Sequence, residues 1–337
     1  VRDVPVPRRD GIKLMADVYR PDGPGVHLVL VRRTPYNRTG HVTANKVIAL
    51  RGNAGKNDNM NTGPGRRGGR GVRSGGVSVA TILGLFLAGY PGAEAARDKP
   101  VLHGRHWVAI TGKPLGATAG AKMFERGGNA VDATCAMLAV VSTMFDGVSW
   151  GGETQALIYN PHTRKVIGIN ACGVAPTGAT PEYFRQKEMK YPPEDGPLAA
   201  ITPGNPGGLM VMLAEFGTLT LRDVLEPAMQ MAAGYPIEEE LVNQIGANTK
   251  KLEQWPHSKT VFLRESGGKL VAPQPGEIWG QPDLLATLRK LVETEAEARR
   301  AGKGRSEAIY AARDRFYRGD IAEEFVRASQ EQGGDTQ

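Results

Sequence analysis

Residues 116–138 read GATAGAKMFERGGNAVDATCAML, and this stretch decides how the main body of the chain is built. Small residues dominate its first half, which predicts a helix that ends at the pair Gly127-Gly128. A second helix is predicted to open at Asn129 and to continue through the run AVDATCAMLAVVSTMF. Apolar positions recur at helical spacing and nearly surround this second helix, so we expect it to be buried.

A β-hairpin is predicted after this helical pair. The runs TQALIYN and KVIGIN are rich in β-forming residues and flank a polar turn at residues 161–164. The connection before the hairpin contains Ser149 in the string GVSWG, the G-x-S-x-G pattern of a serine-hydrolase nucleophile elbow. An elbow joins a strand to a following helix, whereas Ser149 lies between a helix and a strand. We therefore interpret Ser149 as a turn residue near a pocket and not as a nucleophile.

The composition indicates a globular chain whose positive charge is unevenly distributed. Of its 337 residues 40% are apolar, which suffices to bury the core of one large or two ordinary domains. Residues 1–76 carry 15 Lys and Arg against 5 Asp and Glu, whereas the remainder carries 27 against 30. Because the excess of positive charge belongs to the N-terminal quarter, we expect no nucleic-acid partner for the body.

Cysteine and histidine spacing gives no metal or redox motif. The chain has two cysteines, Cys135 and Cys172, without a C-x-x-C pair, and the sequence leaves open whether they form a bridge. His103 and His106 form an H-x-x-H string that no nearby carboxylate supports. We therefore predict no metal site and no cofactor.

Four segments are predicted along the chain. Residues 1–36 alternate apolar and polar positions in three runs, which is typical of a small β-meander. Residues 37–59 are rich in Gly and Asn without apolar periodicity, which indicates a linker with the composition of a disordered segment. Residues 60–95 have the character of a signal peptide, and residues 96–337 form the main body.

The signal-like segment begins at Met60. Its basic region contains Arg66, Arg67, Arg70 and Arg73, and the apolar run 77–88 and the small-residue site Ala93-Glu94-Ala95 follow. This order predicts translation from Met60, cleavage before Ala96 and a periplasmic or secreted location. The apolar run is shorter than the about 20 residues of a membrane span, so no stable span is expected. An RNA-binding RGG segment and a buried core helix are the alternative interpretations.

From about residue 107 onward the chain resembles the large subunit of the gamma-glutamyltransferases. The stretches that carry the resemblance follow the family's order and spacing: GGNAVDA, APTGATPEYF, TPGNPGGLMVMLAEFGTLTLRDVLEPAMQMAAGYPI, QPDLLATLRKL and RFYRGDIAEEFVRASQEQGG. The resemblance implies an α+β fold, the four-layer αββα sandwich of N-terminal-nucleophile hydrolases, which this chain would form incompletely. It also implies a precursor that cuts itself before a threonine and acts on gamma-glutamyl amides of the glutathione type.

The catalytic threonine of that family has no counterpart here. A threonine hydroxyl needs an adjacent base, and the freed N-terminus of the small subunit supplies it. The family's processing site reads roughly T-T-H or T-S-H, and no such string lies downstream of residue 107. We therefore predict that this chain contains no catalytic residue, that its partner is a small subunit from the same precursor, and that it is inactive alone.

The resemblance also marks a departure in the substrate site. The family carries an Arg-Glu pair where this chain has Cys172 and Gly173, and a thiol cannot grip a carboxylate as a guanidinium does. Either the substrate is not glutathione, as in acylase-like relatives, or another cation takes over, with Arg164 and Lys165 nearby in sequence. We favour a different substrate. Cys172, Gly173, Asn170 and Ser149 are the candidate substrate-binding residues.

Two other functions remain open at this stage. Residues 1–36, with VPVPRRDGIKLMADVYRP and RRTPY, resemble the start of the CocE/NonD serine hydrolases, which cleave acyl esters and X-Pro peptides. That resemblance implies a serine ester or peptide hydrolase. The third hypothesis is a non-catalytic subunit that depends on a separately encoded partner.

Overall fold

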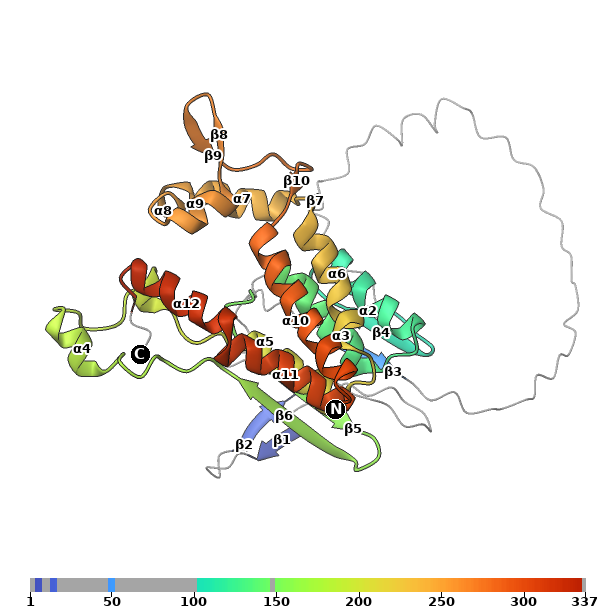
Figure 1. The fold of residues 1–337 in the computed structure, drawn as a ribbon. Coiled ribbons are helices and arrows are strands. Elements are labelled where there is room, and N and C mark those ends of the chain that lie inside the picture. Colours follow the sequence, from blue (N-terminus) through green and yellow to red (C-terminus); the bar gives the residue numbers. More distant parts are fainter. Residues whose placement is uncertain (1–3, 8–12, 17–47, 52–101, 146–148, 335–337) are drawn as a thin grey trace, which may run out of the picture. The chain divides into compact units, whose positions relative to one another are not determined.

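The computed structural model describes residues 102–145 and 149–334, together with the backbone of three short strands nearer the N-terminus (Figure 1). Those strands are β1 (Val4–Pro7), β2 (Lys13–Ala16) and β3 (Ile48–Arg51). The chain divides into two units, residues 1–53 with 105–337 and residues 54–104. All helices and strands given below belong to the first unit.

The three N-terminal strands form two antiparallel pairs. β1 pairs with β2, as predicted for the first two runs of the meander. The third run and the signal-like segment 60–95 lie outside the described residues. β3 pairs with β4 (Trp107–Ile110), with Ile48 opposite Ile110. The sequence predicted no strand within residues 37–59, because an apolar run of four residues is too short to show a period.

The helical pair predicted from residues 116–138 is present. α2 (Pro114–Glu125) and α3 (Ala130–Thr143) are separated by Gly127, whose φ of 82° favours glycine. Asn129 caps α3 by accepting from the N–H groups of Val131 and Asp132 at 2.8 and 3.1 Å. Every residue of α3 except Thr134 is buried, which confirms the prediction of a buried helix.

Four further helices enclose α3 or pack on its neighbours (Figure 1). They are α5 (Asn205–Phe216), α6 (Leu221–Ala233), α10 (Pro282–Arg300) and α11 (Arg305–Arg318). α3 contacts α2, α5 and α6, while α10 contacts α6 and α11 contacts both α5 and α10. Their shared core includes Met137, Leu213 and Leu225, each almost completely buried. Side chains of this size stabilise the fold by about 1.5–3 kcal/mol each when fully buried.

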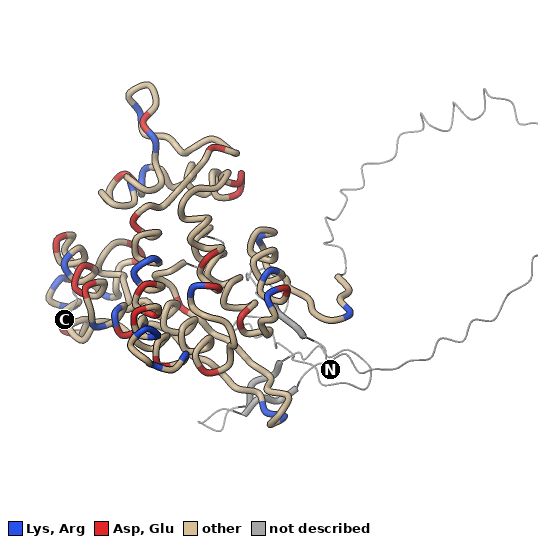
Figure 2. The backbone as a smooth tube through the Cα atoms, turned by 45° about the vertical axis from the view of Figure 1, so that its right-hand side comes forward, with Lys and Arg blue, Asp and Glu red and all other residues tan. Residues whose placement is uncertain are grey.

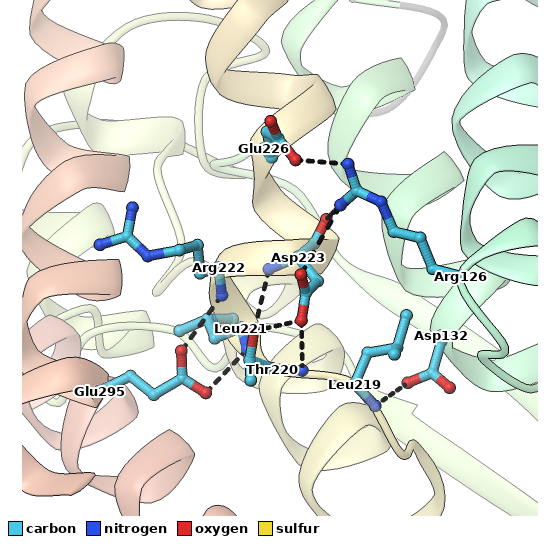
Figure 3. A network of polar contacts seen from close by, with 9 residues as sticks. All are labelled: Arg126, Asp132, Leu219, Thr220, Leu221, Arg222, Asp223, Glu226 and Glu295. Carbon is cyan, nitrogen blue, oxygen red and sulfur yellow. Dashed lines mark hydrogen bonds and ion pairs between the residues drawn. The ribbon is translucent and has the colours of Figure 1, made fainter.

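A polar network fixes the start of α6 (Figure 3). Thr220 and Asp223 form a capping box at the first turn of the helix. Glu295 of α10, itself buried, accepts from the N–H groups of Leu221 and Arg222 at 2.8 and 3.1 Å. Burial raises the pKa of Glu295, although these two N–H donors favour the ionised form. The N–H groups at this helix start thus have acceptors, including the buried N–H of Leu221.

The predicted hairpin consists of β5 (Thr154–Asn160) and β6 (Lys165–Ala171). The strands pair antiparallel from Thr154 opposite Ala171 to Asn160 opposite Lys165. Both contact α5, and Ile158 is buried. The hairpin therefore rests on α5, and its second strand ends at the N-terminal turn of that helix.

The remaining elements are short or lie at the edges of the helical core. They are α4 (Pro181–Gln186), the 3-10 helix η1 (Pro197–Ala199), β7 (Tyr235–Pro236), α7 (Glu239–Ala247), α8 (Thr249–Leu252), α9 (Pro256–Phe262), β8 (Arg264–Ser266), β9 (Lys269–Val271), β10 (Ile278–Trp279) and α12 (Asp320–Glu331). Helices and strands are mixed, as an α+β class requires. Within the described residues strands pair only two by two, so the four-layer αββα sandwich stays a prediction.

Acidic and basic residues are interspersed along the described helices (Figure 2). This mixing agrees with the nearly balanced charge that the sequence gives for the body. No helix in the described part of the chain is long and apolar enough to cross a membrane. The apolar run 77–88 lies outside that part.

Candidate functional site

The turn that contains Ser149 is held by the first residue of α5. Asn205 is fully buried, and its side-chain nitrogen donates to the Ser149 carbonyl at 2.8 Å and to Ser142 Oγ at 2.7 Å. Its side-chain oxygen accepts from the Thr154 hydroxyl at 2.8 Å. The backbone N–H groups of Gly204 and Asn205 both donate to the Gly152 carbonyl. Asn205 thus ties the turn, the start of β5 and the start of α5 together, a role that the sequence analysis missed.

Ser149 lacks the surroundings of a nucleophile. Ser149 is half-buried and lines a cavity of about 800 Å³ together with Phe145, Glu153 and Gln155. No histidine lines this cavity in the part of the chain that the structure describes. A serine nucleophile needs a general base within hydrogen-bonding reach. The geometry therefore agrees with the interpretation of Ser149 as a turn residue.

The other three candidate residues lie together at the end of β6. Asn170, Cys172 and Gly173 line a second cavity, of about 270 Å³, which Ser149 does not reach. The opposite wall consists of Arg313 and Tyr317 from α11, and the first turn of α5 contributes Gly204, Gly207 and Gly208. The structure thus separates Ser149 from the candidate residues on β6. It also adds two residues that the sequence analysis did not single out.

Close backbone approach explains the glycines around this second cavity. A Cβ at Gly204 would lie 2.0 Å from the Ala171 carbonyl oxygen, and a Cβ at Gly173 would lie 2.0 Å from that of Thr202. At Gly207 it would lie 2.7 Å from the Tyr317 hydroxyl. The end of β6 and the start of α5 therefore touch through backbone atoms, which only glycine permits at this distance.

Tyr317 is fixed in place by two hydrogen bonds. Its hydroxyl donates to the Pro203 carbonyl at 2.6 Å and accepts from the Gly207 N–H at 2.9 Å. Burial raises the pKa of Tyr317, so the phenol stays neutral. The Arg313 guanidinium lies over its ring, 5.3 Å from the centroid. Tyr317 belongs to the FYRGDIAE block and Arg313 precedes it by one helical turn, a spacing that could have pointed to both residues.

Neither cysteine has the environment of a reactive thiolate, and both thiols are free. The Cys172 side chain is exposed and accepts from Gln155 Nε2 at 3.1 Å. Its pKa is raised mainly by a hydrogen bond with the Glu153 side chain. Burial raises the pKa of Cys135 well above its ordinary value. The sequence left open whether Cys135 and Cys172 form a disulfide bridge, and in this structure they do not.

The described residues offer no cluster of three or more His, Cys, Asp or Glu side chains that could hold a metal ion. Arg164, which the sequence analysis considered as a substitute cation, is exposed in the hairpin turn with a φ of 56°. Neither Arg164 nor Lys165 lines the cavity at the end of β6. Among the residues that the structure describes, the cationic side chain of this cavity is Arg313.

The chain is similar to proteins of known sequence and structure. A sequence model described as Gamma-glutamyltranspeptidase matches residues 116–337. The "Glutathione hydrolase-like YwrD proenzyme" of Bacillus subtilis is 30% identical over 68% of this chain and 40% of its own length. The "Acylase ACY 1 proenzyme" of a Pseudomonas species is 31% identical over 65% of this chain and 41% of its own length.

The structure of the Helicobacter pylori gamma-glutamyltranspeptidase is also similar. It superimposes with a TM-score of 0.60 at 26% identity, over 70% of this chain and 63% of that one. The chain spans about two fifths of the length of the curated relatives it matches. The family match covers well over half of the chain, and the fold agrees with it. The chain therefore belongs to the gamma-glutamyltranspeptidase family.

Proposed function

We propose that this chain is the large-subunit part of an enzyme that hydrolyses gamma-glutamyl or related amides, or transfers their acyl group. The observation that carries the proposal is the family match over residues 116–337, which includes both walls of the cavity at the end of β6. The nucleophile of the proposal is a threonine at the N-terminus of a small subunit released from the same precursor. The word proenzyme in the names of two relatives supports such processing.

The proposed chemistry proceeds in two steps. The threonine hydroxyl attacks the amide carbonyl while the threonine's own α-amine takes the proton, which then goes to the departing amine. Water or an amino acid attacks the resulting acyl-enzyme ester and regenerates the threonine. The part assigned to this chain is to hold the acyl group, because the walls at β6 and α11 surround a space of small-molecule size. No residue of this chain is assigned a covalent role.

The acyl group is proposed to differ from the gamma-glutamyl group of glutathione. Cys172 and Gly173 stand where the family's Arg-Glu pair is expected, and the exposed Cys172 thiol is held neutral by its raised pKa. A neutral thiol cannot pair with a carboxylate. The 31% identity to an acylase proenzyme supports an acylase-like substrate.

The test uses the product of the intact gene in its native host. We expect a processed fragment whose N-terminal residue is threonine, and loss of all turnover when that threonine is changed to alanine. Acyl amides without an α-amino group are expected to be cleaved faster than gamma-glutamyl anilide. Ordinary family efficiency on glutathione would overturn the assigned substrate. A separately encoded small subunit, or no processing at all, would favour the partner-dependent subunit instead.

A periplasmic or secreted location is part of the proposal. The basic region after Met60, the apolar run 77–88 and the site before Ala96 support it. Intact-mass measurement of the protein outside the cytoplasm is expected to give a species that begins at Ala96. A secreted species that retains Val1 would contradict both the start at Met60 and the cleavage.

A further inference from the structure

Among the described residues, Arg313 differs from Arg305 and Arg315 of α11 because no acceptor lies within hydrogen-bonding distance of its donors. Arg305, on the same helix, donates to the carbonyl oxygens of Leu213, Ala214, Gly217 and Leu219 at 2.7–3.1 Å. Arg315 donates to both carboxylate oxygens of Asp320. Within the described residues, Arg313 Nε is shielded from solvent and has no hydrogen-bond partner. Its nearest ion partner, Asp314, lies at 3.7 Å, beyond hydrogen-bonding distance.

The surroundings hold this guanidinium in place but give it no hydrogen-bonded acceptor among the described residues. It stacks over the ring of Tyr317, whose own hydroxyl is fixed by Pro203 and Gly207. No acidic side chain lines the cavity of about 270 Å³ among the residues that the structure describes. An anionic ligand in the cavity therefore meets no acidic side chain and can accept from the terminal N–H groups of Arg313.

The direction of α5 adds to the positive potential of this cavity. Gly204, Gly207 and Gly208 form its wall, so the N-terminal end of the α5 dipole faces the same space as Arg313. The first N–H groups of α5 already have acceptors in Gly152 and Tyr317. The helix therefore contributes a favourable field, and the hydrogen bonds to a ligand fall to Arg313.

A second, apolar groove shares part of its lining with the cavity. It has a volume of about 300 Å³ and shares Val174, Thr202, Pro203 and Tyr317 with the cavity. Its far side is formed by α12, where Phe325 is 47% exposed although it is a large apolar residue. The two pockets are thus neighbours, with the cationic Arg313 lining the cavity and the apolar Phe325 lining the groove.

We propose that these two pockets bind a small organic acid, with its carboxylate on Arg313 and its apolar tail in the groove beside α12. A carboxylate matches the guanidinium fork in charge and geometry. The proposal rests on the proposed function in taking this acid to be the acyl part of the substrate. It narrows that part to acyl groups that end in a carboxylate and lack the α-amino group of a gamma-glutamyl group. Arg313 is then the residue that selects the substrate, in place of the arginine expected at Cys172.

The test measures binding to the full chain, so that it does not depend on turnover. Phenylbutyrate is the probe, and phenylbutyramide is its neutral match. We expect calorimetry to show the acid binding roughly tenfold or more tightly than the amide, because only the acid forms charge-assisted hydrogen bonds with Arg313. Absence of binding, or equal affinity for acid and amide, overturns the proposal whether or not the processed enzyme turns over amides.

Four variants separate the contribution of the Arg313 charge to binding from that of the apolar groove. Arg313→Met is expected to remove the preference for the acid, and Arg313→Lys to retain part of it, since a lysine keeps the charge without the fork. Arg318→Met is the matched control on α11, because Arg318 is exposed and does not line the cavity. Phe325→Ser is expected to weaken acid and amide alike. The carboxylate site is overturned if the preference for the acid survives Arg313→Met, or if Arg318→Met removes it equally. The placement of the tail is overturned if Phe325→Ser leaves both affinities unchanged.

Discussion

The two ends of α5 are built in opposite ways. At the C-terminal end Arg305 donates to four carbonyl groups, and Asn129 donates to the Phe216 carbonyl at 2.7 Å. Asp132, fully buried, accepts from the N–H groups of Thr218 and Leu219 just beyond this end. At the N-terminal end three glycines line a cavity in which Arg313 meets no acceptor from the part of the chain that the structure describes.

The difference separates charges that hold the fold from a charge that is available to a ligand. A buried polar group with all its partners stabilises a fold, whereas removing one partner leaves the others unsatisfied at a cost of about 1–3 kcal/mol each. An unpaired donor beside a cavity contributes little to the fold. The comparison therefore predicts that the same substitution at two arginines of one helix changes the stability of the fold by very different amounts.

Arg305→Met is expected to have the largest effect. It leaves the carbonyl oxygens of Leu213, Ala214, Gly217 and Leu219 without their donor at the C-terminal end of α5. We expect the free energy of unfolding to fall by about 3 kcal/mol, because hydrogen bonds to a charged group are worth about 1.5–3 kcal/mol and several share one side chain. Urea unfolding followed by circular dichroism measures the change, and a loss below about 1 kcal/mol would contradict the comparison.

Gly204→Ala tests the backbone contact at the other end. The added methyl group would lie 2.0 Å from the Ala171 carbonyl oxygen, so β6 and α5 must move apart. We expect a loss of about 1–3 kcal/mol in unfolding free energy. Gly246→Ala in α7 is the matched control, since a Cβ there meets no atom within 4 Å. That control is expected to stabilise the chain by roughly 0.4–1 kcal/mol, and equal effects of both substitutions would refute the account.

Glu295→Gln tests the buried carboxylate at the start of α6 through the pH dependence of the unfolding free energy. Burial raises the pKa of Glu295 in the folded chain above its ordinary value of 4.5. The folded state therefore holds this proton more tightly than the unfolded state does, and stability falls as pH rises from below 4.5 through the folded pKa. The variant is expected to lack this decrease, while Glu293→Gln, at an exposed position, keeps it. Urea midpoints measured over that pH range decide the matter.

Local signals in the sequence predicted the helical pair α2 and α3 and the hairpin well. Gly127-Gly128, Asn129 and the apolar run of α3 act within a few residues, so helix, cap and burial follow from the pattern alone. The hairpin followed from two β-rich runs around a polar turn for the same reason. A strand of four residues, β3, had too little length to be recognised.

The candidate site was predicted only in part, because its two walls come from distant parts of the chain. The end of β6 carries Asn170, Cys172 and Gly173, which the sequence analysis singled out together. Arg313 and Tyr317 reach them only because α11 packs on α5, a tertiary contact without a local signature. Ser149 lines another cavity, so nearness in sequence did not imply nearness in the site.

Arg313→Met is expected to have the smallest effect on stability and completes the comparison with Arg305→Met. The substitution removes no hydrogen bond among the described residues, and methionine retains most of the apolar stem that packs beside Tyr317. The contact of the cation with the ring contributes about 0.5–1 kcal/mol, and removal of the unpaired Nε donor offsets that loss. We expect a change within about 1 kcal/mol in urea unfolding. A loss as large as that of Arg305→Met would show that Arg313 also serves the fold, and the two ends of α5 would then differ in geometry alone.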